Sequence, residues 1–315
     1  MEEKSASKVD EILKRLNEGV SNLYESDRYK KYLDVMSKFH NYSVNNCLLI
    51  SMQRPDASYV AGYCAWRDKF HRYVLKGEKG ITIISPTPYK KTHKVQVRDA
   101  DGVPILDKDG NPVTEEKEYV HQAFRATTVF DVSQTDGEPL PSMVGELLDP
   151  VEGYDEYLDV IKELSPVPVK FDEIKSGAKG YFSPKKQEIV IQRGMSEEQT
   201  IKTLLHECAH SRLGHGGDDD HSDKRTHEVQ AESVAYVCCK ALGIDTSEYS
   251  FGYIAGWSSG KEQKELKASL QTIRDQADQM IKGIEEKISH VMELRTEKLA
   301  SETPKFYTEG IKIAM

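Results

Sequence analysis

Hydrophobic residues recur every three or four positions along the first part of the chain, as in the stretch VDEILKRLNEGVSNLY at 9–24. This spacing gathers the apolar side chains on one side of a helix, so it predicts helical structure from residue 8 to about residue 50. The stretch YVAGYCAWRDKFHRYVLKGEKGITIISP at 59–86 begins in the same way and then changes to the β-branched run ITIIS. That change of pattern predicts a helix followed by a strand.

Two turn-rich stretches interrupt the strand-like segments that follow. They read DADGVP at 99–104 and DKDGNP at 107–112, and both combine Asp, Gly and Pro. These residues favour tight turns, so we interpret the stretches as the tips of a polar hairpin insert. The segment ATTVFDVSQT at 126–135 closes this region, and the stretch DGEPLPSMVGELLDP after it is the best linker candidate.

The pattern after residue 150 predicts a helix, a short hairpin (GYFSPKKQEIVIQ), two long helices and a final amphipathic helical segment. We therefore predict an α+β protein of two domains. The expected regions are an N-terminal α+β domain at 1–137, a linker at 138–150, a second domain at 151–258 and a helical tail at 259–315.

Composition narrows the class of protein. The chain has 315 residues, a formal net charge of −9 and 38% hydrophobic residues, and it holds no apolar run as long as a membrane span. The charged N-terminus, MEEKSASKVDEILKRL, lacks the apolar core of a signal peptide. The five cysteines form no CxxC pair, which disfavours a disulfide framework. We expect a cytoplasmic protein with no membrane partner.

The stretch TLLHECAHSRLGH at 203–215 carries the candidate chemistry. Ser196 is a good helix N-cap, and Gln199 is placed to complete a capping box with it. On the predicted helix, His206 and His210 are four residues apart, so both rings project from one face. Two imidazoles at this spacing can bind one zinc ion, and Glu207 beside them can accept a proton from the water that zinc activates. The alternative is an ordinary surface helix with two unused histidines.

A zinc site needs a third protein ligand. The metzincin pattern fails, because Leu213 and Gly216 stand where a glycine and a third histidine are required. Glu228 and Glu232 share a face of the next predicted helix, and we favour Glu228 as the ligand and Glu232 as the partner of a ligand histidine. The alternative for Glu228 is a solvated carboxylate. Three histidines are further candidates for the third ligand, but we interpret them as residues of a helix end or of the surface: His215, His221 and His227.

Two further expectations concern this site. Tyr181, beside the predicted strand EIVIQ, is a candidate for stabilising an oxyanion, with packing as the alternative. The expected cofactor is Zn2+, although the donor set does not separate zinc from manganese or cobalt.

Charge is unevenly distributed along the chain. From Arg54 to Arg98 there are ten Lys/Arg and three Asp/Glu, a local excess of seven positive charges. Cations that follow phosphates and aromatic faces that stack on bases are what single-stranded DNA binding requires. The alternative is that the aromatics form a core and the lysines a solvated face. The candidate DNA-binding residues are Arg54, Trp66, Arg67, Lys69, Arg72, Lys76, Lys79, Lys90, Lys91 and Lys94.

Three segments, taken together, resemble the ArdC-type antirestriction proteins of mobile genetic elements. They are FHNYSVNNCLLISMQRPDASYVAGYCAWRDKFHRYVLKGEKGITIISP, TVFDVSQTDGEPLP and the pair TLLHECAH and HEVQAESVAYVCC. The resemblance implies an N-terminal domain that binds single-stranded DNA and a C-terminal zincin-like metallopeptidase domain, similar to the ImmA/IrrE group. It also implies that His206, His210 and Glu228 are the metal ligands and that Glu207 is the general base.

The expected function is therefore an antirestriction protein that binds single-stranded DNA and carries a zinc-dependent peptidase site for an unknown protein substrate. Two alternatives stay open. One is a repressor-cleaving metallopeptidase whose N-terminal domain binds protein. The other is a non-catalytic DNA-binding protein with a structural zinc, which a fourth protein ligand would favour.

Overall fold

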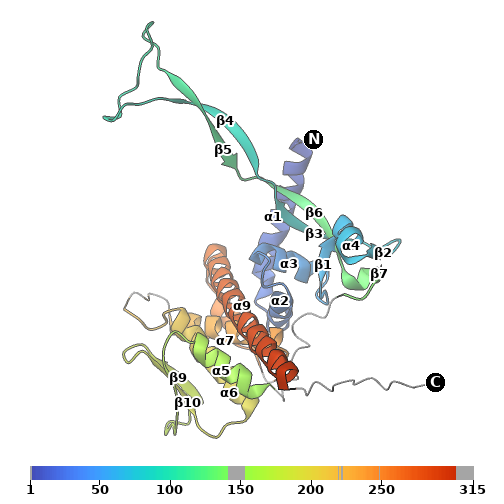
Figure 1. Cartoon of the computed structure of the whole chain (residues 1–315), viewed down its shortest axis with the longest axis vertical. Coiled ribbons are helices and arrows are strands. Elements are labelled where there is room, and N and C mark those ends of the chain that lie inside the picture. Colours follow the sequence, from blue (N-terminus) through green and yellow to red (C-terminus); the bar gives the residue numbers. More distant parts are fainter. Residues whose placement is uncertain (1, 141–152, 219, 221–222, 248, 303–315) are drawn as a thin grey trace, which may run out of the picture. The chain divides into compact units, whose positions relative to one another are not determined.

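The computed structural model describes residues 2–140, 153–218, 220, 223–247 and 249–302 (Figure 1). It is a mixture of helices and short strands, as the α+β prediction requires. Contacts within the chain divide it into two compact units. The first unit is Met1–Gly19 with Leu48–Glu138, and the second is Val20–Cys47 with Pro139–Met315. Most of the predicted linker, from residue 141 onward, lies outside the described residues.

Short antiparallel sheets dominate the first unit. Its sheets are β1-β6-β3, β2-β7 and β4-β5. Two helices, α1 (Glu2–Leu23) and α3 (Val44–Gln53), each contribute part of their length to this unit. The remaining elements are β1 (Val60–Gly62), α4 (Tyr63–Phe70), β2 (Arg72–Val74), β3 (Ile81–Pro86), β4 (Tyr89–Gln96), β5 (Thr114–His121), β6 (Phe124–Asp131), the short 3-10 helix η1 (Val132–Gln134) and β7 (Thr135–Gly137).

Strands β4 and β5 form a two-stranded ribbon that extends away from β3 and β6 within this unit (Figure 1). Beyond the strands, the chain makes two successive turns of the same kind. The Asp99 carboxylate accepts hydrogen bonds from the backbone N–H groups two and four residues later, and the Asp107 carboxylate does the same. Gly102 and Gly110 follow with φ of +80° and +83°, a conformation that favours glycine. The polar hairpin insert predicted from the two turn-rich stretches is confirmed.

The second unit packs helices around one small sheet. Its elements are α2 (Ser26–Lys38), α5 (Tyr154–Leu164), β8 (Val169–Asp172), β9 (Gly180–Ser183), β10 (Glu188–Gln192), α6 (Glu197–Arg212), α7 (Lys224–Ala241), α8 (Ile254–Ser258) and α9 (Gln263–Glu302). The sheet order is β8-β10-β9, with β8 parallel and β9 antiparallel to β10. Helix α6 contacts β9, β10 and α7, so the edge strand β9 lies beside α6.

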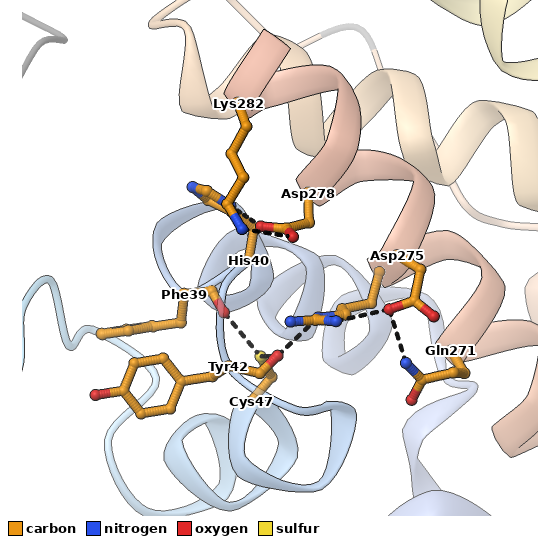
Figure 2. A network of polar contacts seen from close by, with 9 residues as sticks. Phe39, His40, Tyr42, Cys47, Gln271, Asp275, Asp278 and Lys282 are labelled. Atoms are coloured by element: carbon orange, nitrogen blue, oxygen red, sulfur yellow. Dashed lines mark hydrogen bonds and ion pairs between the residues drawn. The ribbon is translucent and has the colours of Figure 1, made fainter. Parts of the chain in front are cut away.

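Residues 20–47 belong to the second unit because α2 buries its apolar face against α7 and the following loop is fixed to α9. Tyr29 Oη lies 2.8 Å from Ser233 Oγ in the interior. Figure 2 shows the loop contacts, in which His40 Nδ1 lies 2.8 Å from Asp278 Oδ1. The Arg274 side chain also donates to the Tyr42 carbonyl at 2.8 Å.

These contacts correct two of the predicted boundaries. The sequence pattern assigned residues 20–47 to the N-terminal domain and 259–315 to a separate tail, whereas α9 packs on α5 and α7 as part of the second unit. The reason is burial, since Leu270, Ile273 and Ile281 of α9 are fully enclosed. Helical periodicity shows that a segment has an apolar face, but it does not show which partner covers that face.

Only one of the two hydrogen bonds of the predicted capping box forms at the N-terminus of α6. The Ser196 hydroxyl accepts from the Gln199 backbone N–H. The Gln199 side chain instead donates to Thr203 Oγ1 at 3.1 Å and accepts from Lys179 Nζ at 2.7 Å. It therefore links α6 to the loop before β9.

Two sequence expectations, on disulfides and on membrane spans, can be compared with the structure. All five cysteines are free, and all but Cys64 are buried. Among the described residues, no helix is both long enough and apolar enough to cross a membrane.

Candidate functional site

Helices α6 and α7 bring together the three side chains that the sequence predicts as metal ligands. His206 Nε2 and His210 Nε2 lie 3.0 Å apart, and Glu228 Oε2 lies 3.5 Å and 3.8 Å from them. One ligand atom from each residue falls within 4.8 Å of the other two. A tetrahedral zinc ion with ligand distances of about 2.0–2.1 Å separates its ligand atoms by about 3.4 Å, so the three donors fit one ion.

The geometry has a local origin on each helix. His206 and His210 are one turn apart on α6, so their rings lie on the same face. Helix α7 begins at the N-cap Asp223, whose carboxylate accepts from the Arg225 and Thr226 backbone N–H groups. Burial of the α7 face that contains Val229 leaves Glu228 half-exposed, on the side towards the two imidazoles.

Glu232 lies one turn after Glu228 and faces the other nitrogen of His206. Its Oε2 is 3.2 Å from His206 Nδ1. A carboxylate at Nδ1 keeps the proton there and leaves Nε2 free to bind a metal. The structure thus places Glu232 where the sequence analysis expected the partner of a ligand histidine.

The electrostatics of the cluster favour charge pairing. Burial by itself lowers the pKa of His206, but the carboxylates of Glu228 and Glu232, which form ion pairs with its ring, outweigh burial and raise the pKa above its usual value. The same contacts hold the pKa of Glu228 well below that of an ordinary glutamate. Glu207 is 7% exposed, and burial raises its pKa. A carboxylate whose pKa is raised is a stronger base than an ordinary glutamate, which suits a proton acceptor.

His215 supports His210 from behind, a role that sequence reasoning missed by treating it as a helix-end residue. The two Nδ1 atoms lie 2.9 Å apart, and His215 Nε2 lies 3.1 Å from Gln230 Oε1. Since an amide oxygen only accepts, the proton of His215 is on Nε2, and its Nδ1 accepts from His210. Burial lowers the pKa of His215 to about 4, which keeps the ring neutral and able to accept.

The other candidate histidines do not join the cluster. His227 stacks on His215 with ring centroids 4.4 Å apart, and its Nε2 lies 2.7 Å from Asp220 Oδ2. His221 lies outside the described residues. Within the described part of the chain, the metal cluster therefore holds three protein ligands.

A cleft of about 380 Å3 opens beside the cluster. It lies between the start of β9, helix α6 and the loop after α7. Its lining residues are Lys179, Gly180, Gln199, Lys202, Thr203, His206, Glu207, Glu232 and Tyr249. Neither Lys202 nor Tyr249 was predicted from the sequence, although Lys202 falls on the α6 face of His206, and this spacing could have identified it.

Tyr181 is 41% exposed but lies on the wrong face of the sheet for the predicted oxyanion role. Successive side chains of a strand point to opposite faces, and Gly180 is the β9 residue that faces α6. A Cβ on Gly180 would lie 2.6 Å from Thr203 Cγ2. Tyr181 pairs with Val190 on the other face and does not line the cleft.

The predicted DNA-binding residues separate into structural and exposed groups. Trp66 is fully buried, its indole N–H donates to the Phe130 carbonyl at 2.9 Å, and its ring packs against Phe70. Its assignment to DNA binding is therefore wrong, because the ring fills the core of the first unit. Arg72 is held by Thr135 Oγ1 at 2.8 Å and by neighbouring carbonyls, so it fixes β2 to β7. Arg54 is half-buried, with Glu78 at 3.9 Å.

The other predicted cations are exposed. Two of them have carboxylate partners, with Arg67 2.6 Å from Asp68 and Lys90 2.9 Å from Glu118. The remaining exposed lysines are Lys69, Lys76, Lys79, Lys91 and Lys94. The structure places Lys90, Lys91 and Lys94 on strand β4 of the ribbon.

One face of the ribbon carries a row of rings. Residues directly opposite each other in an antiparallel pair share a face, and Tyr89 is opposite His121 while Lys91 is opposite Tyr119. His93 follows on the same face. Neighbouring ring centroids are 5.4 Å apart for Tyr89 and His121, 5.3 Å for His121 and His93, and 5.6 Å for His93 and Tyr119. We call this set, with Lys91, the ring face.

Comparison with known proteins gives three findings. Residues 5–130 match the family model for the N-terminal domain of anti-restriction factor ArdC. A Bacillus anthracis protein described as uncharacterized is 26% identical over 325 residues, covering 93% of this chain and 54% of that protein. The chain thus spans about half the length of this curated relative.

Two crystal structures of antirestriction protein ArdC from the R388 plasmid are also similar. The metal-free structure is 20% identical, with a TM-score of 0.46, and the match covers 79% of this chain and 86% of that chain. The Mn(II)-bound structure is 18% identical, with a TM-score of 0.42, and the match covers 81% and 97%.

Proposed function

We propose that this chain, whose residues 5–130 match the family model for the ArdC N-terminal domain, is an ArdC-type antirestriction protein that combines a metal-dependent peptidase site with a surface for single-stranded DNA. The second unit would carry the peptidase site and the first unit the DNA surface. Zinc is the expected metal, and the same donor set would also bind manganese or cobalt.

The observation that carries the peptidase proposal is the placement of Glu207 beside three convergent donors. Two imidazole nitrogens and one carboxylate oxygen can share an ion, and Glu207 lines the same cleft without joining them. Three protein ligands leave a coordination position for substrate or water, which is the difference between catalytic and structural zinc sites.

When bound, the metal would act as a Lewis acid that polarises a carbonyl group and lowers the pKa of water. The protein's own part begins with Glu207, which would accept the proton of the attacking water and deliver it to the leaving amine. The Phe182 backbone hydrogen-bonds the Glu207 carboxylate and holds it at the wall of the cleft. Glu232 and His215 would fix the orientation of the two ligand rings.

The edge strand β9 offers a way to hold a peptide. It pairs with β10 on one side, and its other side is the edge of the sheet beside α6. An extended peptide can add to such an edge through main-chain hydrogen bonds, which would lay it along the cleft. This observation favours a peptide bond as the bond that is hydrolysed.

The DNA proposal rests on the ring face and the exposed lysines of the first unit. Bases stack on aromatic rings at about 1–3 kcal/mol each, and lysines bind phosphates without reading sequence. The ribbon supplies both, because Tyr89, Tyr119 and Lys91 share one face. Single-stranded DNA fits this surface better than duplex, since only unpaired bases can present their faces to the rings.

Two alternatives remain as competing proposals. A structural zinc requires a fourth protein ligand, and the described part of the chain gives the cluster three. A repressor-cleaving peptidase would use the same metal centre with a first unit that binds protein. Titration of the wild-type protein with labelled oligothymidylate tests whether the first unit binds DNA, as proposed, or only protein, as this alternative requires.

The test of the peptidase proposal has two stages. Metal analysis of the purified wild type should give one ion per chain, and His206→Ala should lose it. The metal-loaded protein is then incubated with a proteome-derived peptide mixture, and new termini are identified by mass spectrometry. Cleavage that is present in the wild type and lost in Glu207→Gln supports the proposal. A wild type that binds no metal, or a Glu207→Gln variant that cleaves equally well, refutes it.

A further inference from the structure

Lys202 is a buried lysine that lines the cleft beside the metal cluster. It is 6% exposed, and its side chain belongs to the lining of the cleft. Among the described residues, its ammonium takes part in no hydrogen bond or ion pair; Asp245 is close enough to feel its charge but does not pair with it. The ammonium therefore faces the cleft with no carboxylate paired to it, and a cation in this position can bind an anion through charge-assisted hydrogen bonds.

The position of Lys202 relates it to the reaction centre. It lies four residues before His206 on α6, so the same face of the helix presents both, about 6 Å apart along the axis. An extended peptide advances about 3.3 Å per residue. A peptide held along β9 would therefore bring a side chain to Lys202 within about two residues of the bond at the metal.

The groove continues past Lys202. A neighbouring hollow of about 530 Å3 shares Lys179, Gln199 and Lys202 with the cleft and extends towards Met195 and Ile174. Lys179 is fixed at the junction, because its ammonium donates to Gln199 Oε1 at 2.7 Å. Two cationic side chains thus mark the place where the two hollows meet.

The charges along the groove select the kind of anion. Glu207 and Glu232 line the metal end of the cleft, and Glu228 stands beside it. A nucleic acid strand would bring several phosphates against these carboxylates and be repelled. A peptide with one acidic side chain places its single negative charge at Lys202 and leaves the metal end to the neutral backbone.

We propose that the junction of the two hollows is a specificity subsite for a glutamate or aspartate side chain of the peptide substrate, with Lys202 as the residue that binds the carboxylate and Lys179 as its second cation. This inference rests on the proposed peptidase site and adds its substrate class. Lys202 is a specificity residue that takes no part in the proton transfer by Glu207.

The test uses binding, so it does not depend on turnover. Two tripeptide hydroxamates are compared that differ only in carrying Glu or Gln two residues from the metal-binding hydroxamate. Affinities for the zinc-loaded full chain are measured by calorimetry, and zinc content is measured on the same samples. The wild type should bind the Glu probe roughly ten-fold more tightly than the Gln probe, the effect expected of one charge-assisted hydrogen bond.

The variants isolate Lys202 from other causes. Lys202→Met keeps the volume of the buried side chain and should bind the two probes equally, whereas Lys202→Arg should keep the preference. Lys185→Met is the matched control, because Lys185 is an exposed lysine between β9 and β10 that lies outside the cleft. It should bind as the wild type does.

Three results would overturn the proposal. Equal affinity of both probes for the wild type removes the acidic subsite and leaves the metal site standing. Failure of both probes to bind the zinc-loaded wild type removes the peptidase proposal and this inference together. Oligothymidylate that displaces the Glu probe from the wild type and from Lys185→Met, and that fails to bind Lys202→Met, assigns the site to phosphate.

Discussion

His215 Nδ1 lies 2.9 Å from His210 Nδ1, so a neutral buried imidazole takes the place that a carboxylate usually occupies behind a metal-binding histidine. The contact is fixed at its far end by Gln230, which in turn donates to Ser269 Oγ at 3.2 Å. This chain of hydrogen bonds links the cluster on α6 to α9 and sets the tautomer of both rings.

The first prediction concerns this contact. His215→Phe keeps a ring in the buried space but removes the acceptor, so His210 loses its orientation, and metal affinity should fall about 10–100-fold. Affinity is measured by competition with a chromophoric chelator. His215→Asn, which keeps an acceptor, should lose less, and His290→Asn, at an exposed position on α9, should not change. Unaltered affinity in folded His215→Phe would show that the contact is only packing.

The second prediction distinguishes the two glutamates of α7. Glu228→Ala removes a ligand atom and should weaken zinc binding more than Glu232→Ala, which removes only the partner of His206 Nδ1. Zinc content after dialysis against a weak chelator measures the difference. Tight, stoichiometric zinc in Glu228→Ala would contradict the assignment of Glu228 as the third ligand.

The third prediction is that proton transfer can be removed without removing the metal. Glu207→Gln keeps the size of the side chain and leaves both histidines in place. Any peptidase rate should fall by roughly 10²–10⁴-fold, the contribution of a positioned general base. Zinc content and affinity for single-stranded DNA should stay at the wild-type level. Loss of DNA binding in this variant, with zinc still present, would place the DNA site at the metal cleft.

The fourth prediction concerns metal uptake and pH. The metal-free protein holds His206 protonated to a higher pH than usual, because Glu228 and Glu232 raise its pKa. Zinc binds the deprotonated ring, so uptake near pH 7 should release about one proton, and affinity should fall as pH is lowered. Calorimetry in two buffers of different ionisation enthalpy gives the number of protons. A heat of binding independent of the buffer would count against the prediction.

The fifth prediction separates the faces of the ribbon. Tyr119→Ala removes a ring from the ring face and should weaken binding of oligothymidylate roughly ten-fold, within the range for one stacked base. Lys91→Gln and Lys90→Gln each remove one positive charge, but only Lys91 is on the ring face, so it should have the larger effect. Fluorescence anisotropy at low salt measures both. Equal effects of the two lysines would indicate a diffuse electrostatic surface.

Trp66 requires a separate measurement, because its contribution is to stability. Trp66→Ala leaves a cavity in the core of the first unit and should cost about 3–5 kcal/mol of unfolding free energy. Urea unfolding followed by circular dichroism tests this. Any loss of DNA binding in this variant should accompany the loss of structure, whereas folded Trp66→Ala with weakened DNA binding would restore the contact role.

The sequence by itself determined the features that depend on short-range spacing. The Ser196 cap and the four-residue interval between His206 and His210 are properties of one helix, so they follow from the order of residues. The repeated Asp-x-Asp-Gly turns of the ribbon are equally local, since each aspartate bonds the backbone that immediately follows it. The segments that resemble ArdC-type proteins are likewise continuous stretches of sequence, and the family model supports this resemblance over residues 5–130.

The tertiary structure decided which partner each face meets. Five residues were candidates for the third ligand, and only the packing of α7 on α6 brought Glu228 to the two histidines. Trp66 and the rings of the ribbon are aromatic residues of the same basic region of the sequence. The fold buries Trp66 in the core of the first unit and leaves the ribbon rings on the ring face. The periodicity of residues 20–47 shows that they have an apolar face. Which unit they belong to depends on the helices that cover this face, and these helices are in the second unit.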